Sequence, residues 1–430
     1  MRIAVVEPVG RGGLIHYAFQ LCRALAEEGA PQGVEVVLVT DRSYELDALV
    51  APFRVERPLR LWDAKPEGRG GPGRQPPGGL RRGLRRAGRA SRWYRERLRL
   101  LGFLRRLRPD VVQLGDLRFA GDLAFLLALG ATGARLADVC HNLRPFVLGG
   151  RAAGSFGGAA SRAALSRFAF RRIYRRFDAV FVHWPENREL FLAAYGPLPG
   201  IVRAIPHGNQ LLFEELRDPA VTAESLRRRL GLAADQPVVL AFGTLAAYKG
   251  LDLLVEAFAR LLPRVPAARL VIAGFPLPGF DPEALGALAR RLGIAEAVRV
   301  VPGYVPSSEV AAWMALAAVA AFPHREVFQS GVLQAAASLG APIVASRAGA
   351  TAEVVRDGET GLLVPPGDAG ALAAALERLL RDPAARAFAR RLGERAAEEA
   401  RTRFAWRAIA REVLAAYREL LGEPPAEAAA

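Results

Sequence analysis

The sequence has 430 residues, 51% of them hydrophobic, and its 59 basic and 43 acidic side chains give a formal net charge of +16. The longest apolar run, 310–322, is shorter than the roughly 20 residues that a membrane-spanning helix needs, which excludes such a helix. Cys22 and Cys140 are the two cysteines, and the chain enters a strand at once, without a signal-like segment. We therefore expect two or three domains without disulfides, in the cytoplasm.

The first half of the chain alternates predicted strands and helices. An apolar strand over 2–8 leads through a glycine-rich turn, with Gly12 and Gly13, into a helix that ends at Gly29. Such a turn lets the backbone approach a ligand closely, although a tight connection without a ligand is an equal alternative. Further strands are predicted over 34–40, 109–116, 134–142, 178–184 and 201–210. The pattern predicts a doubly wound parallel sheet.

Most of the excess positive charge is concentrated in one segment. Between Arg60 and Arg108 stand 16 basic and three acidic residues, a net charge of +13. Within it, 63–88 is rich in Gly, Pro and Arg and has little to bury, so a mobile loop is expected. A second basic segment, 161–177, has helical spacing and no acidic residue. Such charge implies an anionic partner (a membrane surface, a nucleic acid or a phosphorylated substrate), and merely solvated arginines are the alternative.

Both basic segments carry apolar residues at helical spacing. In 91–107, we expect one face to carry Tyr94, Leu98, Leu101 and Leu104. In 162–176, the corresponding residues are Leu165, Phe168 and Ile173. A basic helix with an apolar face can lie on an anionic leaflet, so the inner face of the membrane is a candidate location for a peripheral protein.

A second cycle of strands and helices follows a break over 211–224. The sequence therefore predicts two Rossmann-like domains, 1–214 and 215–403, which face each other across a cleft. The last amphipathic stretch, 404–421, is expected to be a helix packed on the N-terminal domain.

The stretch 318–346 carries the clearest functional pattern. An apolar strand ends at Pro323, the polar turn HREVFQSG follows, and a small-residue helix leads to the strand PIVAS. In such a βαβ unit, the free N–H groups at the start of the helix lie at the carboxyl edge of the sheet and bind phosphates. Glu326 in this turn is suited to the hydroxyls of a sugar attached to such a phosphate.

This stretch resembles the donor site of retaining glycosyltransferases with the GT-B fold, family 4 in particular. Glu326 matches the first of two glutamates spaced eight residues apart, and Gln334 stands in place of the second. The segments GAPIVAS and DGETGLLVPPGD, over 340–346 and 357–368, match the family pattern closely. The resemblance covers almost the whole chain and is weakest over 60–110.

The resemblance also implies roles for single residues. Glu326, His141 and Lys249 are the expected catalytic residues: Lys249 neutralises the leaving diphosphate, and His141, at the end of a strand, faces the donor sugar. The family's arginine before this lysine is missing, and Arg325 or Arg11 are candidates to replace it. His207 fits a structural turn of the family. The expected donor-binding residues are Gly12, Gly13, Gly243, Lys249, Tyr304, Val305, Glu326, Phe328, Gln329, Ser330, Gly331, Val332 and Gln334.

The leading interpretation is a retaining hexosyltransferase that uses a nucleotide diphosphate sugar as co-substrate and no cofactor. The acceptor is a lipid-linked, glycan or small-molecule group, such as a polysaccharide precursor. One alternative is a nucleotide-sugar-binding protein with weak or lost activity, because the arginine and the second glutamate are absent. A nucleic-acid-binding protein is disfavoured, since few aromatic residues alternate with the arginines. The chain has no Asp-x-Asp, and His16, His183 and His324 lack metal-ligand spacing, so no metal is expected.

Overall fold

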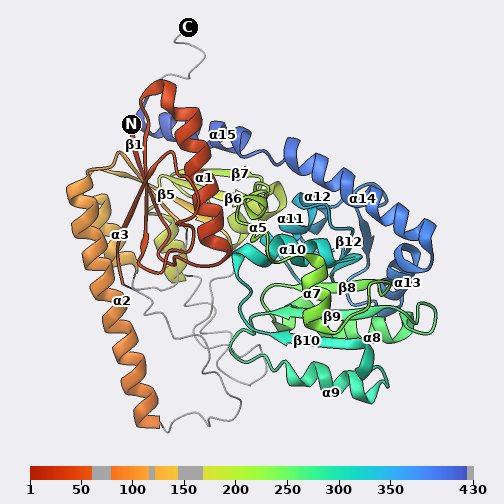
Figure 1. The fold of residues 1–430 in the computed structure, drawn as a ribbon. Helices are drawn as coiled ribbons and strands as arrows, with labels where there is room; N and C mark the ends of the chain where they lie inside the picture. The colour runs from red at the N-terminus through yellow and green to blue at the C-terminus, as the bar shows by residue number, and fades with distance from the viewer. Residues whose placement is uncertain (61–78, 116–121, 144–167, 424–430) are drawn as a thin grey trace.

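The computed structural model describes residues 1–60, 79–115, 122–143 and 168–423, with the backbone alone for 79–90. Two parallel sheets lie side by side, each covered by helices (Figure 1). The first has the order β3-β2-β1-β4-β5-β6-β7, with strands β1 (Arg2–Val6), β2 (Glu35–Asp41), β3 (Arg54–Leu59), β4 (Val111–Leu114), β5 (Arg135–Cys140), β6 (Ala179–His183) and β7 (Ile201–Ile205). Its helices are α1 (Gly13–Gly29), α2 (Gly79–Leu107), α3 (Asp122–Gly130) and α5 (Pro185–Tyr195), with a helical segment over 168–174.

The second sheet has the order β10-β9-β8-β11-β12-β13. Its strands are β8 (Val238–Phe242), β9 (Arg269–Gly274), β10 (Val298–Pro302), β11 (Val319–Phe322), β12 (Ile343–Ser346) and β13 (Leu362–Val364). The helices that follow the first sheet are α6 (Leu212–Glu215), α7 (Ala223–Leu230), α8 (Leu251–Leu261), α9 (Glu283–Arg291), α10 (Val310–Leu316), α11 (Gly331–Ser338), α12 (Thr351–Val354), α13 (Ala369–Leu380), α14 (Pro383–Thr402) and α15 (Trp406–Leu421). The central strands are buried on both faces, as their apolar runs predict, whereas the edge strands β3, β7 and β10 are mostly only partly buried.

The two sheets confirm the GT-B-like α/β fold expected from the alternating pattern. In both, strand order reverses next to the first strand of the domain, β1 or β8, and ligands bind at the carboxyl ends of strands near such a point. Helix α14 leads from the second domain back toward the first, where α15 lies against α1 (Figure 1). Ile409, Val413 and Tyr417 of α15 are buried in the core that α1 shares. The C-terminal helix therefore belongs structurally to the first domain.

Helix α2 corrects two expectations. It begins at Gly79, inside the segment expected to be a loop, because leucine and arginine favour helix strongly enough to offset its interior glycines. The buried face is formed by Leu100, Leu104 and Leu107 with Leu101, whereas Tyr94 and Leu98 are 52% and 69% exposed.

Residues 61–78 of the basic segment, and Leu165 of the second one, lie outside the described residues. Among the described helices, none combines the length and hydropathy needed to cross a bilayer.

Candidate functional site

Glycines at the carboxyl edge of the second sheet let α11 approach closely. Gly243, directly after β8, has a φ of 101°, and its N–H donates to the carbonyl of Ala273 at 3.0 Å. A Cβ at this position would lie 2.7 Å from Cγ2 of Val332 in the first turn of α11. Only glycine combines this backbone conformation with such a short distance. The end of β8 and the start of α11 therefore form one compact edge.

Lys249 lies at this edge and is the clearest candidate for binding an anion. The Nζ atom would lie 3.4 Å from a Cβ at Gly243, and the residue is only 7% exposed. None of the ion pairs among the described residues involves Lys249. Burial lowers its pKa to about 8. A buried ammonium group without an acidic partner is unfavourable unless a ligand supplies the negative charge.

The N-terminus of α11 is adjacent to this lysine. Ser330 caps the helix by accepting a hydrogen bond from the N–H of Leu333 at 3.2 Å. The first turn, with Gly331 and Val332, contributes N–H groups that have no partner within the helix. Helix N-termini attract anions through these groups and through the helix dipole. Lys249 and α11 therefore offer positive charge to the same edge of the sheet.

The loop between β11 and α11 holds Glu326, which is exposed. Its neighbour Arg325 forms a two-pronged ion pair with Asp252, at 2.8 Å and 2.7 Å. Arg11, the other candidate to replace the missing arginine, donates to the carbonyl of Ser43 at 3.3 Å. Arg325 also donates to the carbonyl of Ala247, in the same turn as Lys249, so both arginines are engaged in this conformation. Among the described residues of this edge, the lysine and the helix terminus are the positive groups without an acidic partner.

Other residues of the same loop contact the first domain. Nδ2 of Asn187 donates to the carbonyl of Phe328 at 2.6 Å, and the ring of Phe328 packs against the first domain's core. Oε1 of Gln329 is buried and has no hydrogen-bond partner among the described residues. Phe328 thus positions the loop between the domains, a role that its place in the expected donor-binding set did not indicate.

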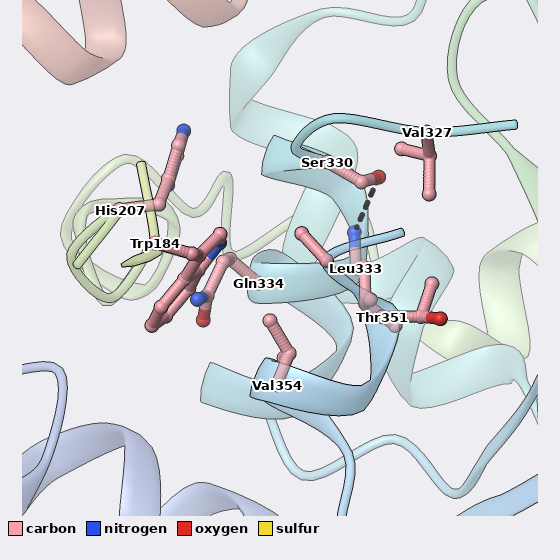
Figure 2. A pocket seen from close by; sticks show the side chains of 9 residues that line it. Trp184, His207, Val327, Ser330, Leu333, Gln334, Thr351 and Val354 are labelled. Carbon is pink, nitrogen blue, oxygen red and sulfur yellow. Dashed lines mark hydrogen bonds between the residues drawn. The ribbon is translucent and has the colours of Figure 1, made fainter. Parts of the chain in front are cut away.

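Gln334 faces an enclosed pocket between the two domains. The side chain is fully buried, and both amide atoms have no hydrogen-bond partner within the described part of the chain. Figure 2 shows it among Trp184, His207, Ser330, Leu333 and other residues of the pocket. The free space of the pocket, about 10 Å³, is room for about one water molecule, so the expected contact of Gln334 with a ribose is not available in this conformation. Trp184, which sequence reasoning missed, has a φ of 73°, a rare conformation that is typical of constrained functional regions.

A second polar network joins the domains through Glu45, another residue that sequence reasoning missed. Oε1 of Glu45 accepts from the N–H of Gly12 at 2.7 Å and lies 2.9 Å from Nε2 of His16. From the second domain, the hydroxyl of Tyr304 donates to Oε2 at 2.5 Å, and Oγ of Ser307 lies 3.0 Å from the same His16 nitrogen. The glycine-rich turn expected to contact the donor therefore already holds a carboxylate.

The other expected residues of these two turns have less specific surroundings. Gly13 is the first residue of α1, and a Cβ there would meet no atom within 4 Å. Val305 packs, partly buried, against the core of the second domain. In the same two turns, Gly12 and Tyr304 are already bound to Glu45, so these turns contact each other through that carboxylate.

His141 follows β5 and is 6% exposed. Its Nδ1 atom lies 3.1 Å from Nε2 of His183, the last residue of β6, and its ring lies 6.4 Å from that of His207. Burial, and then the charge of His207, lower the pKa of His141 to about 3. The imidazole is therefore neutral near pH 7 and acts as a hydrogen-bonding group. The spacing of the histidines did not predict this cluster, because its members follow three different strands.

Comparison with known families assigns both halves of the chain. Residues 12–208 match the family described as a glycosyl transferase 4-like domain, and residues 236–382 match the family described as glycosyl transferases group 1. The sucrose-phosphate synthase of Thermosynechococcus elongatus has a similar structure, with a TM-score of 0.68, 25% identity and coverage of 98% of this chain and 99% of that one. The Anabaena protein HepE, solved with UDP and glucose, has a TM-score of 0.66 at 19% identity, with coverage of 98% and 99%.

Two curated relatives are similar in sequence. A D-inositol 3-phosphate glycosyltransferase of Acidothermus cellulolyticus is 38% identical over 246 residues, which are 56% of this chain and 52% of that protein. A GDP-mannose-dependent phosphatidylinositol monomannoside mannosyltransferase of Mycolicibacterium smegmatis is 34% identical over 226 residues, 51% of this chain and 57% of the relative. The chain thus spans about half the length of the curated relatives it matches.

Proposed function

Because this chain belongs to the family 4-like glycosyltransferases and has their GT-B fold, we propose that it transfers a hexose from a nucleotide diphosphate donor to an acceptor, with retention of configuration. The observation that carries this proposal is the buried ammonium group of Lys249, which has no acidic partner among the described residues and lies beside the start of α11. A diphosphate supplies the missing negative charge at this position.

The proposed role of each residue follows from where charge develops during the reaction. As the bond between the sugar and the diphosphate breaks, negative charge grows on the leaving phosphate oxygen. Lys249 and the N–H groups of the first turn of α11 stabilise that charge. Glu326, in the exposed loop before α11, binds hydroxyls of the donor sugar. His141, neutral because it is buried, donates or accepts a hydrogen bond at the reacting sugar. No step of this account needs a metal ion.

The acceptor lies on the side of the first domain. The names of the two curated relatives refer to inositol phosphate and to phosphatidylinositol monomannoside, so a phosphorylated or lipid-linked polyol is the acceptor class that we propose to test first. We also propose that the protein works at the inner face of an anionic membrane. Tyr94 and Leu98 of α2 and Phe168 of the second basic segment are more than half exposed, and exposed arginines flank all three. Arginines near an anionic leaflet contribute about 1 kcal/mol each.

A donor screen followed by a transfer assay tests the proposal. A nucleotide sugar present at about 100 times its dissociation constant adds about 2.7 kcal/mol of stability, so the correct donor should raise the melting temperature. Incubation of that donor with inositol phosphates and with phosphatidylinositol vesicles should then give a glycosylated product, whose anomeric configuration is read by NMR. Binding without turnover on any acceptor would support a nucleotide-sugar-binding protein instead, and inversion would refute the retaining mechanism.

A further inference from the structure

Three histidines converge at the carboxyl edge of the first sheet. His141 directly follows β5, His183 ends β6, and His207 stands two residues after β7. Because these are neighbouring parallel strands, their ends meet at the same edge. All three side chains are buried, with exposures of 6%, 1% and 4%. One ring nitrogen of each lies within 4.8 Å of the others.

The arrangement of the ring nitrogens fits a metal ion. Nε2 of His183 and Nδ1 of His141 are 3.1 Å apart. Two imidazoles bound to one tetrahedral zinc at 2.0–2.1 Å have nitrogens about 3.3 Å apart. A small outward movement of the two rings would therefore admit an ion between them, in place of the hydrogen bond that they now share.

The surroundings of the cluster also favour ligation. Nδ1 of His207 lies 3.3 Å from the carbonyl oxygen of Gly208, and donation to that carbonyl leaves the lone pair on Nε2. Metal-bound histidines commonly have their second nitrogen fixed in this way. The ring of Tyr17 lies 4.6 Å, 5.3 Å and 5.2 Å from those of His141, His183 and His207, which holds the three imidazoles together.

The protonation states are compatible with this chemistry. A metal binds the lone pair of a neutral imidazole, and protonation competes with it. All three rings are buried, and burial disfavours the charged imidazolium form. All three rings are therefore neutral near pH 7. Imidazole ligands select zinc, copper, nickel or cobalt over magnesium and calcium.

We propose that His141, His183 and His207 form a site for a divalent transition metal of the zinc type, and that its occupation inhibits the enzyme. The inhibition rests on the proposed function, since the ion would take the lone pair of the His141 imidazole that faces the sugar. The ion is an inhibitor and not a catalyst, so transfer proceeds with the site empty. Three protein ligands leave one tetrahedral position open to water or an anion.

Binding is tested without reference to activity. The full-length protein, stripped with a chelator and freed of it, is titrated with Co²⁺, and we expect the visible absorption bands of tetrahedral cobalt at one ion per chain. Equilibrium dialysis with Zn²⁺ should give the same stoichiometry. His183→Ala and His207→Ala should each weaken binding by at least about tenfold. His324→Ala is the matched control: His324 is also buried, lies outside the cluster, and should leave metal binding unchanged.

Further measurements distinguish a loss of metal binding from a loss of folding, and test whether the bound metal inhibits transfer. Circular dichroism and melting curves establish that each variant is folded, and His183→Gln, which keeps a hydrogen-bonding group, provides a milder second variant. Zn²⁺ should inhibit transfer, and a chelator should restore it. Absence of a cobalt spectrum, or a spectrum that persists in both His183 variants, would overturn the site. Metal binding without inhibition of an active enzyme would overturn the inhibitory role alone, and absence of transfer with every donor would count against the proposed function while leaving the binding result valid.

Discussion

The hydroxyl of Tyr304 donates a hydrogen bond to Oε2 of Glu45 at 2.5 Å, and this contact joins residues 259 positions apart in the sequence, one from each domain. The other carboxylate oxygen of Glu45 accepts from the N–H of Gly12. Glu45 thus fixes the glycine-rich turn of the first domain to the loop that follows β10. Movement of the two domains relative to each other would have to break this contact.

Glu45→Gln should change the acid sensitivity of the protein. Burial alone raises the pKa of this carboxyl, but the hydrogen bond and charge of His16, with the hydrogen bonds from Tyr304 and Gly12, lower it to about 2. A lowered carboxyl pKa stabilises the fold above the ordinary value of 4.5, and this stabilisation is lost as the pH falls toward 2. The variant should therefore lose less free energy of unfolding than the wild type between pH 4.5 and 2, by roughly 2–3 kcal/mol, in urea titrations. Parallel curves for the two proteins would contradict this account.

Lys249→Met should stabilise the protein while it abolishes donor binding. Burial lowers the pKa of Lys249 from 10.5 to about 8, so below pH 8 the folded protein bears the cost of a buried charge. The unfolded state binds more protons between pH 8 and 10.5, and the stability of the wild type therefore rises across that range. At pH 7, the variant should exceed the wild type by up to roughly 3 kcal/mol of unfolding free energy, and the gap should close by pH 10.5. A variant that is less stable at pH 7 would show that the lysine has a partner in the folded protein.

Much of the fold could be predicted because the strands are continuous apolar runs separated by turn residues. The start of α2 could not be predicted in this way: Gly83 and Gly88 interrupt its pattern, and the favourable helix propensity of the surrounding leucines and arginines outweighs them. The apolar face expected for α2 was also only partly right, since Leu101 and Leu104 are buried, whereas Tyr94 and Leu98 are exposed. Burial, and not spacing alone, decides which stripe faces the core.

Some relationships within the site could likewise be predicted from the sequence, and others could not. Lys249 follows β8 and the start of α11 follows β11, a neighbouring strand much further along the chain, so the family resemblance and not local sequence brought them into one expected site. Glu45 comes from a loop after β2 that has no periodic pattern, and its partners belong to the other domain. The histidine cluster carried a usable signal: His141, His183 and His207 each stand at the end of a predicted strand, and the ends of neighbouring parallel strands meet. The separation of the three histidines along the chain did not indicate that they lie close together.

Glu326→Gln should reduce transfer by at least about 100-fold while the protein remains folded and still binds the nucleoside diphosphate. The reason is that the carboxylate is proposed to contact the sugar, and the diphosphate is bound elsewhere. Glu359→Gln, which changes an exposed glutamate of the same domain, serves as the matched control and should keep the wild-type rate. Initial rates with the identified donor measure the transfer activity of both variants and of the wild type. Wild-type turnover of the Glu326 variant would remove this residue from the mechanism.

Association with membranes should depend on the exposed apolar residues of α2. The double substitution Tyr94→Ser with Leu98→Ser should weaken co-sedimentation with anionic vesicles, because both side chains are exposed beside arginines. Binding by the wild type should fall as salt rises and should be absent with zwitterionic vesicles. Leu292→Ser, an exposed leucine of the other domain, should have no effect. If the wild type stays in solution with every vesicle, a soluble acceptor replaces the membrane-borne one.

Calorimetric titration of the wild type and of Lys249→Ala with UDP, GDP, ADP and the corresponding nucleosides tests the central claim most directly. At pH 7, one nucleoside diphosphate should bind the wild type, and the substitution should weaken that binding by at least about tenfold, because a buried charge that pairs with the diphosphate is lost. Affinity of the wild type should also fall as the pH rises past about 8, where the free lysine loses its proton. Equal affinities of the two proteins for the diphosphate would contradict the account, as would the absence of binding to all three diphosphates.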